Sequence, residues 1–216
     1  MKVPKLKIPV FPLNVVLLPA LPLPLHIFEE RYKQMIGECL KNESEFGIVL
    51  MEGRQMRKIG CTAKIVQVLK RFDDGRMDIL TVGKNRFTIM DISEEKQYLE
   101  SNVELFDDFI EDDSPEMDAL KEQGLILLKK LENKLQKSEG SELVRNMDSR
   151  TLSFILGGSS VISAGEKQEL LEMKVTSERL HRSVELLQDA IIRVQLIENI
   201  KKLLPEDHIT HGFSKN

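Results

Sequence analysis

The placement of proline restricts the fold of this chain more than any other feature. Six of its eight prolines lie at positions 4, 9, 12, 19, 22 and 24 of 216 residues. Because proline fixes φ and has no N–H group, this segment cannot form a helix, and a central strand would lose hydrogen bonds. We therefore expect an extended segment of short edge strands and turns. Leu6, Ile8 and Val10 alternate with Lys7 and Pro9, which predicts a half-buried first strand.

The hydrophobic pattern becomes helical after the prolines. Apolar residues recur at helical spacing over 28–40, with acidic residues at the start and Lys41 after the end. The pattern predicts one short amphipathic helix whose apolar stripe is Phe28, Tyr32, Met35, Ile36 and Leu40.

A run of predicted strands follows this helix. Segments 46–51, 61–70, 76–82, 86–92 and 98–106 are short, apolar and rich in β-branched residues. Asp74-Gly75 predicts a hairpin, because glycine tolerates the positive φ that tight turns need. Strands in a run with one early helix favour a mostly antiparallel sheet or small barrel.

Charge is concentrated in one short stretch. Residues 104–118 hold eight Asp or Glu and no Lys or Arg, whereas residues 1–103 hold 16 Lys or Arg and 13 Asp or Glu. We expect the acidic stretch to form a solvated, exposed boundary between two parts of the chain. The sequence pI near 5.7 and the lack of a clustered basic face argue against nucleic acid as a partner.

Helical patterns occupy the rest of the chain. Ser114-Pro115 predicts the start of a helix that ends before Gly140, and a second helix is expected over 143–156. Ser163 and Glu166 form a capping-box pattern that opens a short helix ending near Lys174. Thr176 or Ser177 is expected to cap a last helix that stops before Pro205, with an apolar stripe formed by Leu180, Val184, Leu187, Ile191 and Val194.

These patterns predict an α+β protein with a β-rich subdomain at 1–113, a helical bundle at 114–205 and a polar tail at 206–216. The stripe of the last helix could mediate self-association, but two heptads are short, and packing within the chain is the interpretation we favour.

The sequence contains no recognisable catalytic or cofactor-binding motif. Neither of the common glycine-rich phosphate loops is present, nor a Gly-x-Ser-x-Gly elbow or a His-Glu-x-x-His helix. His208 and His211 could touch a metal, but a polar tail is the simpler interpretation. Cys39 and Cys61 fall on apolar faces, where free cysteine behaves as a small hydrophobe. We expect no enzyme activity, no cofactor and no metal.

The chain lacks the features of an export signal, and prolines interrupt its apolar stretch at 10–28. We therefore expect a soluble cytoplasmic protein that does not interact with membranes.

One long string of residues resembles a known family. Residues 8–32 include Phe11-Pro-Leu13 and Pro24-Leu-His-Ile-Phe28, which resemble the opening of the Lon protease N-terminal domain, the LON substrate-binding domain. The resemblance continues in family order through segments 46–50, 59–65, 74–83, 86–87, 170–172 and 178–180. Two departures affect local backbone shape: Ala20 stands where glycine is common, and Glu30 replaces the usual proline before Arg31.

The resemblance implies a PUA-like β-rich pseudo-barrel subdomain with one helix, followed by a helical bundle. It also implies a non-catalytic module that recognises unfolded or damaged polypeptides in protein quality control, together with a protease-unfoldase subunit as a possible partner. Since the ATPase and Ser-Lys protease modules of Lon have no counterpart here, we expect a stand-alone LON-domain protein or an excised fragment.

The proline-rich segment 17–27 is the candidate rim of a polypeptide-binding surface, since its prolines keep it from pairing like an ordinary strand. The alternative is that its leucines close the β core. An RNA-binding or regulatory PUA-like module and an uncharacterised hydrolase are the alternative functions. The candidate binding residues are Leu21, Leu23, Leu25, His26, Phe28 and Tyr32.

Overall fold

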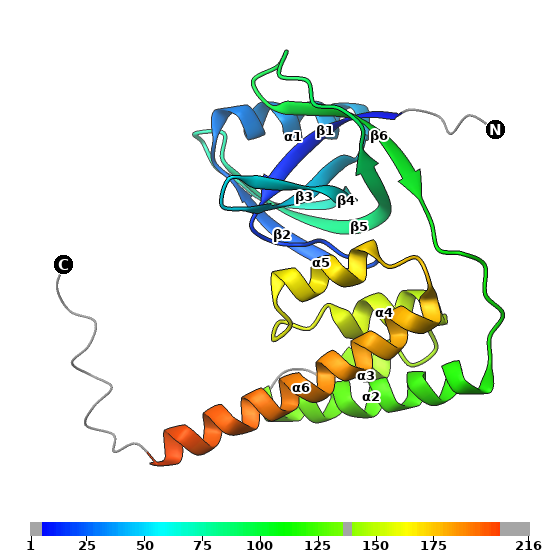
Figure 1. Cartoon of the computed structure of the whole chain (residues 1–216). Helices are drawn as coiled ribbons and strands as arrows, with labels where there is room; N and C mark the ends of the chain where they lie inside the picture. Colours follow the sequence, from blue (N-terminus) through cyan, green and yellow to red (C-terminus); the bar gives the residue numbers. More distant parts are fainter. Residues whose placement is uncertain (1–5, 136–139, 204–216) are drawn as a thin grey trace.

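The computed structural model describes residues 6–135 and 140–203, as a mixed β-sheet at one end and a group of helices at the other (Figure 1). The fold is therefore α+β with C-terminal helices, as predicted. The strands are β1 (Leu6–Leu13), β2 (Pro22–Ile27), β3 (Phe46–Glu52), β4 (Gln55–Arg71), β5 (Met77–Ile89) and β6 (Leu99–Phe106). The helices are α1 (Glu30–Asn42), α2 (Pro115–Leu135), α3 (Gly140–Leu143), α4 (Ser149–Gly157), α5 (Ala164–Glu172) and α6 (Thr176–Leu203).

The six strands are ordered β2-β5-β4-β3-β1-β6, and a further pairing of β5 with β6 closes five of them into a ring. Only β1 and β3 run parallel, so the predicted antiparallel character is confirmed. The buried face of α1 packs against the sheet, where Met35, Ile36, Phe46 and Ile79 form the centre of the main core.

The first strand differs from its prediction at one residue. Ile8 and Val10 are buried, but Leu6 is exposed. At Leu6 the strand pairs with β6 alone, because its pairing with β3 begins only at Val10.

The prediction of two strands at 76–82 and 86–92 was wrong, because β5 is continuous through Gly83. The turn after β1 packs directly on Gly83, whose N–H donates to the carbonyl of Leu21 and whose carbonyl accepts from the N–H of Ala20. A Cβ atom on Gly83 would lie 2.2 Å from the carbonyl oxygen of Leu18. The glycine therefore permits close approach of two backbones.

The hairpin predicted at Asp74-Gly75 is confirmed. The Gly75 N–H donates to the carbonyl of Phe72, and Gly75 has a φ of 82°, in the left-handed region that the turn requires. The predicted strand before this hairpin was too short, since β4 begins at Gln55 and its register shifts at bulges along its length.

The predicted first helix was wrong at its start. It begins at Glu30, and Phe28 is not on its apolar stripe but precedes it with 59% of its surface exposed. Tyr32, Met35 and Ile36 are buried as predicted.

Two predicted helix starts in the C-terminal half are confirmed. The Met117 N–H donates to the Ser114 hydroxyl at the start of α2, and both hydrogen bonds of the capping box between Ser163 and Glu166 are present at α5. The second helix predicted at 143–156 was wrong. The Asp148 carboxylate caps a later start, accepting from the Thr151 N–H, so α4 covers only Ser149–Gly157.

The predicted cap of the last helix was also wrong. Thr176 and Ser177 lie inside α6, and Glu111 caps the helix from outside by accepting from the Ser177 N–H at 3.1 Å and from its hydroxyl at 2.6 Å. The stripe residues Leu180, Val184, Leu187 and Ile191 are buried within the chain. No helix in the described ranges has both the length and the apolar character needed to cross a bilayer.

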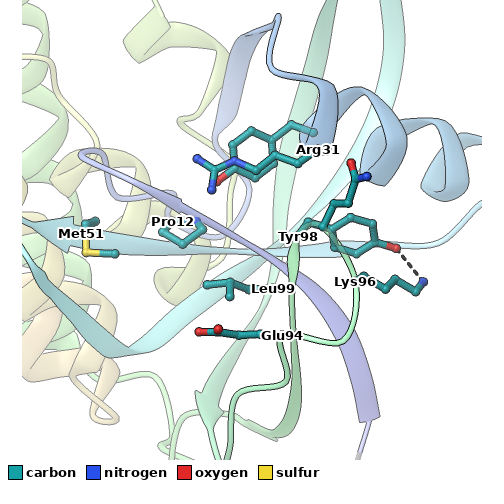
Figure 2. Close-up of a pocket in the computed structure, with 9 residues that line it drawn as sticks. Pro12, Arg31, Met51, Glu94, Lys96, Tyr98 and Leu99 are labelled. Carbon is teal, nitrogen blue, oxygen red and sulfur yellow. Dashed lines mark hydrogen bonds between the residues drawn. The ribbon is translucent and has the colours of Figure 1, made fainter.

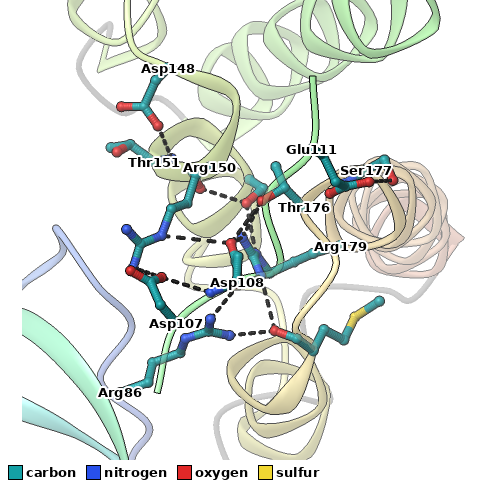
Figure 3. A network of polar contacts seen from close by, with 12 residues as sticks. Arg86, Asp107, Asp108, Glu111, Asp148, Arg150, Thr151, Thr176, Ser177 and Arg179 are labelled. Atoms are coloured by element: carbon teal, nitrogen blue, oxygen red, sulfur yellow. Dashed lines mark hydrogen bonds and ion pairs between the residues drawn. The ribbon is translucent and has the colours of Figure 1, made fainter. Parts of the chain in front are cut away.

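The acidic stretch does not form the fully solvated boundary that its charge predicts. Its Asp108 carboxylate is buried between Arg86 of β5 and Arg179 of α6, whose side chains are both fully buried (Figure 3). Arg86 also donates to the carbonyls of Leu171 and Met173. This cluster, Arg86–Asp108–Arg179, links the sheet to the helices and fixes their relative position.

Candidate polypeptide-binding groove

An open groove lies beside β1, bounded by the start of α1 and by the segment that leads into β6 (Figure 2). Its volume is about 550 Å³, within the usual range for ligand sites. The lining residues are Pro12, Arg31, Tyr32, Met51, Glu94, Lys96, Gln97, Tyr98 and Leu99.

The groove combines an apolar floor with a charged rim. Pro12, Met51 and Leu99 are half-buried, whereas Arg31 and Glu94 are exposed. Figure 2 shows Arg31 on one side of the groove and Glu94 on the other. Such a site can hold an apolar side chain against its floor while polar groups remain at the solvent boundary.

Two tyrosines give the groove fixed walls. Tyr32 is buried, with its ring 3.9 Å from that of Phe11, and the Arg31 guanidinium lies 4.6 Å from the centre of the Tyr32 ring. Burial raises the pKa of Tyr32. Both aromatic contacts restrict the ring, so this wall is preformed.

Tyr98 is held by a polar cluster. Its hydroxyl donates to Glu38 at 2.6 Å, and Lys96 donates to Tyr98 at 2.7 Å and to Glu38 at 2.8 Å. Hydrogen bonds from Lys96 and Tyr98 lower the pKa of Glu38 to about 2, and burial raises the pKa of Tyr98 to about 12. Both pKa values therefore lie far from 7. Glu38 and Tyr98 suit a fixed wall of the groove and not proton transfer near pH 7.

The structure separates the six predicted binding residues. Tyr32 lines the groove, whereas Leu21 and Leu23 line a second cavity of about 270 Å³ beside Gly158. Leu25 packs against the main core. His26, in β2, and Phe28, just after β2, are exposed.

His26 and Phe28 form an aromatic cluster with Phe72. The His26 ring stacks on Phe28 at 5.8 Å and meets the edge of Phe72 at 5.9 Å, and its Nδ1 lies 2.6 Å from the Asp78 carboxylate. The sequence reasoning missed Phe72 because it lies in the hairpin between β4 and β5, and this hairpin comes next to β2 only through the pairing of β2 with β5.

The free edge of β2 is blocked to strand addition. The Leu21 carbonyl accepts a hydrogen bond from the Gly83 N–H of β5. Leu23 and Leu25 lie two and four residues further along the chain, so their N–H and C=O groups also face β5 in the antiparallel register. The outward positions are therefore Pro22, Pro24 and His26, of which only His26 has an N–H group. The prediction that these prolines prevent ordinary strand pairing agrees with this register.

Most residues of the groove were also missed. Met51 belongs to β3, while Tyr98 and Leu99 lie at the start of β6, and both elements reach Pro12 only because β1 lies between β3 and β6. A parallel β1–β3 pair leaves no local signal in sequence. Among the described residues, no group of three or more His, Cys, Asp or Glu could hold a metal. His208 and His211 lie outside the described residues.

The comparisons with known proteins name the family of this α+β chain. It belongs to the ATP-dependent protease La (LON) substrate-binding domain family, whose family model matches residues 7–189. This confirms the resemblance stated from the sequence, and it does not favour RNA binding.

Curated relatives are full Lon proteases. The chain is 26% identical over 214 residues to the Lon protease of Buchnera aphidicola and 24% identical over 209 residues to that of Flavobacterium johnsoniae. These alignments cover 91% and 90% of this chain but 26% and 25% of the relatives. The chain thus spans about a quarter of the length of these relatives.

Solved structures share the fold. The N-terminal domain of Mycobacterium avium complex Lon protease aligns with a TM-score of 0.68 at 23% identity, covering 85% of this chain and 98% of that one. A Lon N-terminal domain protein from Xanthomonas campestris aligns with a TM-score of 0.66 at 22% identity, covering 82% and 96%.

Proposed function

We propose that this chain binds unfolded or damaged polypeptides without catalysing a reaction, as a substrate-recognition module for protein quality control. The observation that supports this most is the preformed groove of about 550 Å³ in a chain that belongs to a substrate-binding family. Unfolded chains expose apolar side chains that folded proteins bury, and the apolar floor of the groove suits such side chains.

Recognition in the groove would depend on side chains. Strand addition at β2, none of whose residues lines the groove, would contribute little, because the outward edge of β2 offers one N–H group. An apolar side chain of the substrate would instead contact Met51 and Leu99, while Arg31 and Glu94 lie at the rim to interact with polar or charged neighbours of either sign. Such binding tolerates many sequences.

We propose a protease-unfoldase subunit as the partner that receives the bound polypeptide, since the curated relatives are Lon proteases. We place the protein in the cytoplasm. Its two cysteines, Cys39 and Cys61, are free and buried, which fits a reducing compartment.

Retention on immobilised protein tests the function. We expect a reduced and alkylated, permanently unfolded model protein to be retained, whereas the same protein in its folded, disulfide-intact form passes through. Equal retention of the two forms, or retention of neither, would contradict the proposal.

A further inference from the structure

The segment that joins the sheet to the helices, residues 107–114, reverses the usual polarity at residues 108–110. Most linking segments place polar side chains outward and apolar ones inward. Here Asp108 is buried, whereas Phe109 is 65% exposed and Ile110 is 100% exposed. We call this the linking segment.

The linking segment is held along its whole length. Asp108 bonds to Arg86, Arg179 and Thr176, and the Phe109 N–H donates to the Lys174 carbonyl at 2.8 Å (Figure 3). Further along, Glu111 accepts from Ser177 and Asp113 accepts from Ser149 at 2.8 Å. Because both flanks are fixed, Phe109 and Ile110 are presented by an ordered backbone, which reduces the entropy lost when a partner binds.

A hollow of about 310 Å³ lies next to Glu111, the residue that follows this pair. It is placed there because Ser177, which bonds to Glu111, is one of its lining residues. Met117 and Leu120 provide its apolar surface. A protruding apolar pair beside an apolar hollow gives a shape that a protein partner could match. The full lining is Ser114, Glu116, Met117, Leu120, Ser177, Glu178 and His181.

The charges around this surface determine the kind of partner. Glu111 and Asp112 flank the apolar pair, and Glu116 and Glu178 line the hollow. Two nearby cations are already engaged, since Arg150 pairs with Asp107 at 2.5 Å and Lys174 lies over the Phe106 ring. His181 is the basic side chain among the residues that line the hollow. A second copy would bring carboxylates against carboxylates, so the surface disfavours self-association.

We propose that Phe109, Ile110 and the adjacent hollow form a docking surface for a protein partner whose apolar cleft is bordered by Lys and Arg side chains. This surface differs in residues and charge from the polypeptide-binding groove, and its occupancy does not depend on the function proposed for that groove.

A titration with a defined probe tests the proposal. The probe is a short synthetic peptide of alternating leucine and lysine, added to the full chain and followed by amide NMR shifts. We expect shifts confined to 109–120 and 174–181, and affinity about tenfold weaker in the double variant Phe109→Ser/Ile110→Ser. Both side chains are exposed, so we expect folding to be retained. Ile126→Ser on α2 is the control, because Ile126 is 65% exposed, as Phe109 is.

Three results would overturn the proposal. The first is affinity of the double variant within a factor of two of the original chain; the second is equal binding of a leucine–glutamate peptide, which would remove the charge argument. The third is a dimer in sedimentation equilibrium that Ile110→Ser dissociates, since the occupant would then be a second copy. Failure of unfolded proteins to bind the groove would leave these outcomes unchanged.

Discussion

Asp108 is the residue whose environment departs most from sequence expectation. One carboxylate lies between two fully buried guanidinium groups. Backbone carbonyls accept from Nη1 of Arg86, whereas its Nε is buried without a partner. Burial alone would raise the pKa of Asp108, but hydrogen bonds from Arg179 and Thr176 and the charges of both arginines lower it to about 2. The ionised form is therefore essential to the cluster.

Stability should depend on this carboxylate at acidic pH. The folded pKa of about 2 lies below the ordinary value of 3.8, so the contribution is complete above about pH 4 and is lost as the pH falls through 2. A shift of this size corresponds to about 2 kcal/mol of unfolding free energy. Urea unfolding, followed by circular dichroism at pH values from about 4 to 2, measures this loss of unfolding free energy.

Asp108→Asn is the control for this pH dependence. We expect it to lower the unfolding free energy at pH 7 by about 3 kcal/mol, because two buried cations lose their counterion, and to flatten the acid slope. Asp107→Asn, at an exposed neighbour, should change stability by about 0.5 kcal/mol or less. An unchanged acid slope in Asp108→Asn would show that other carboxylates cause it.

Ala20 and Gly83 form a second residue-scale test at the turn after β1. Ala20 has a φ of 65°, a conformation that strains a residue with a side chain. We expect Ala20→Gly to raise the unfolding free energy by about 0.5–1 kcal/mol. Gly83→Ala should lower it by about 1–3 kcal/mol, since the new Cβ meets the Leu18 carbonyl. Thermal denaturation measures both effects, and melting temperatures that change in the same direction in the two variants would contradict this interpretation.

At the scale of elements, two local motifs were read correctly, whereas distant partners were missed. The Asp74-Gly75 hairpin and the Ser163–Glu166 capping box depend on residues a few positions apart, so the sequence contains the whole motif. The start of α6 depends on Glu111, which is 66 residues from Ser177. No sequence pattern could assign that cap.

The edge strand β2 gives the prediction at this scale. Replacing Pro22 and Pro24 by threonine restores two outward N–H groups on an exposed edge. We expect concentration-dependent association, measured by light scattering. His26→Thr is the control, because that position already has an N–H group. If this variant associated to the same extent, the effect would come from the threonine side chains and not from the new N–H groups at the edge.

At the scale of the whole molecule, fold class was predictable and the groove was not. Alternation, turns and helix caps define an α+β chain, but the groove depends on β1 lying between β3 and β6. The acidic stretch shows the same limit, since Arg86 and Arg179 that bury Asp108 are 22 and 71 residues away from it. We still propose 1–113 and 114–205 as subdomains, with the Arg86–Asp108–Arg179 cluster as their joint.

The affinity of the groove for an unfolded polypeptide tests the central claim most directly. Met51→Glu places a charge on the apolar floor at a half-buried position, and Ile126→Glu places the same charge on exposed α2. In fluorescence anisotropy with a labelled, reduced and alkylated protein, we expect Met51→Glu to weaken binding by about tenfold, or about 1.4 kcal/mol, and Ile126→Glu to bind like the original chain. Equal affinities of all three proteins would contradict the assignment of the groove.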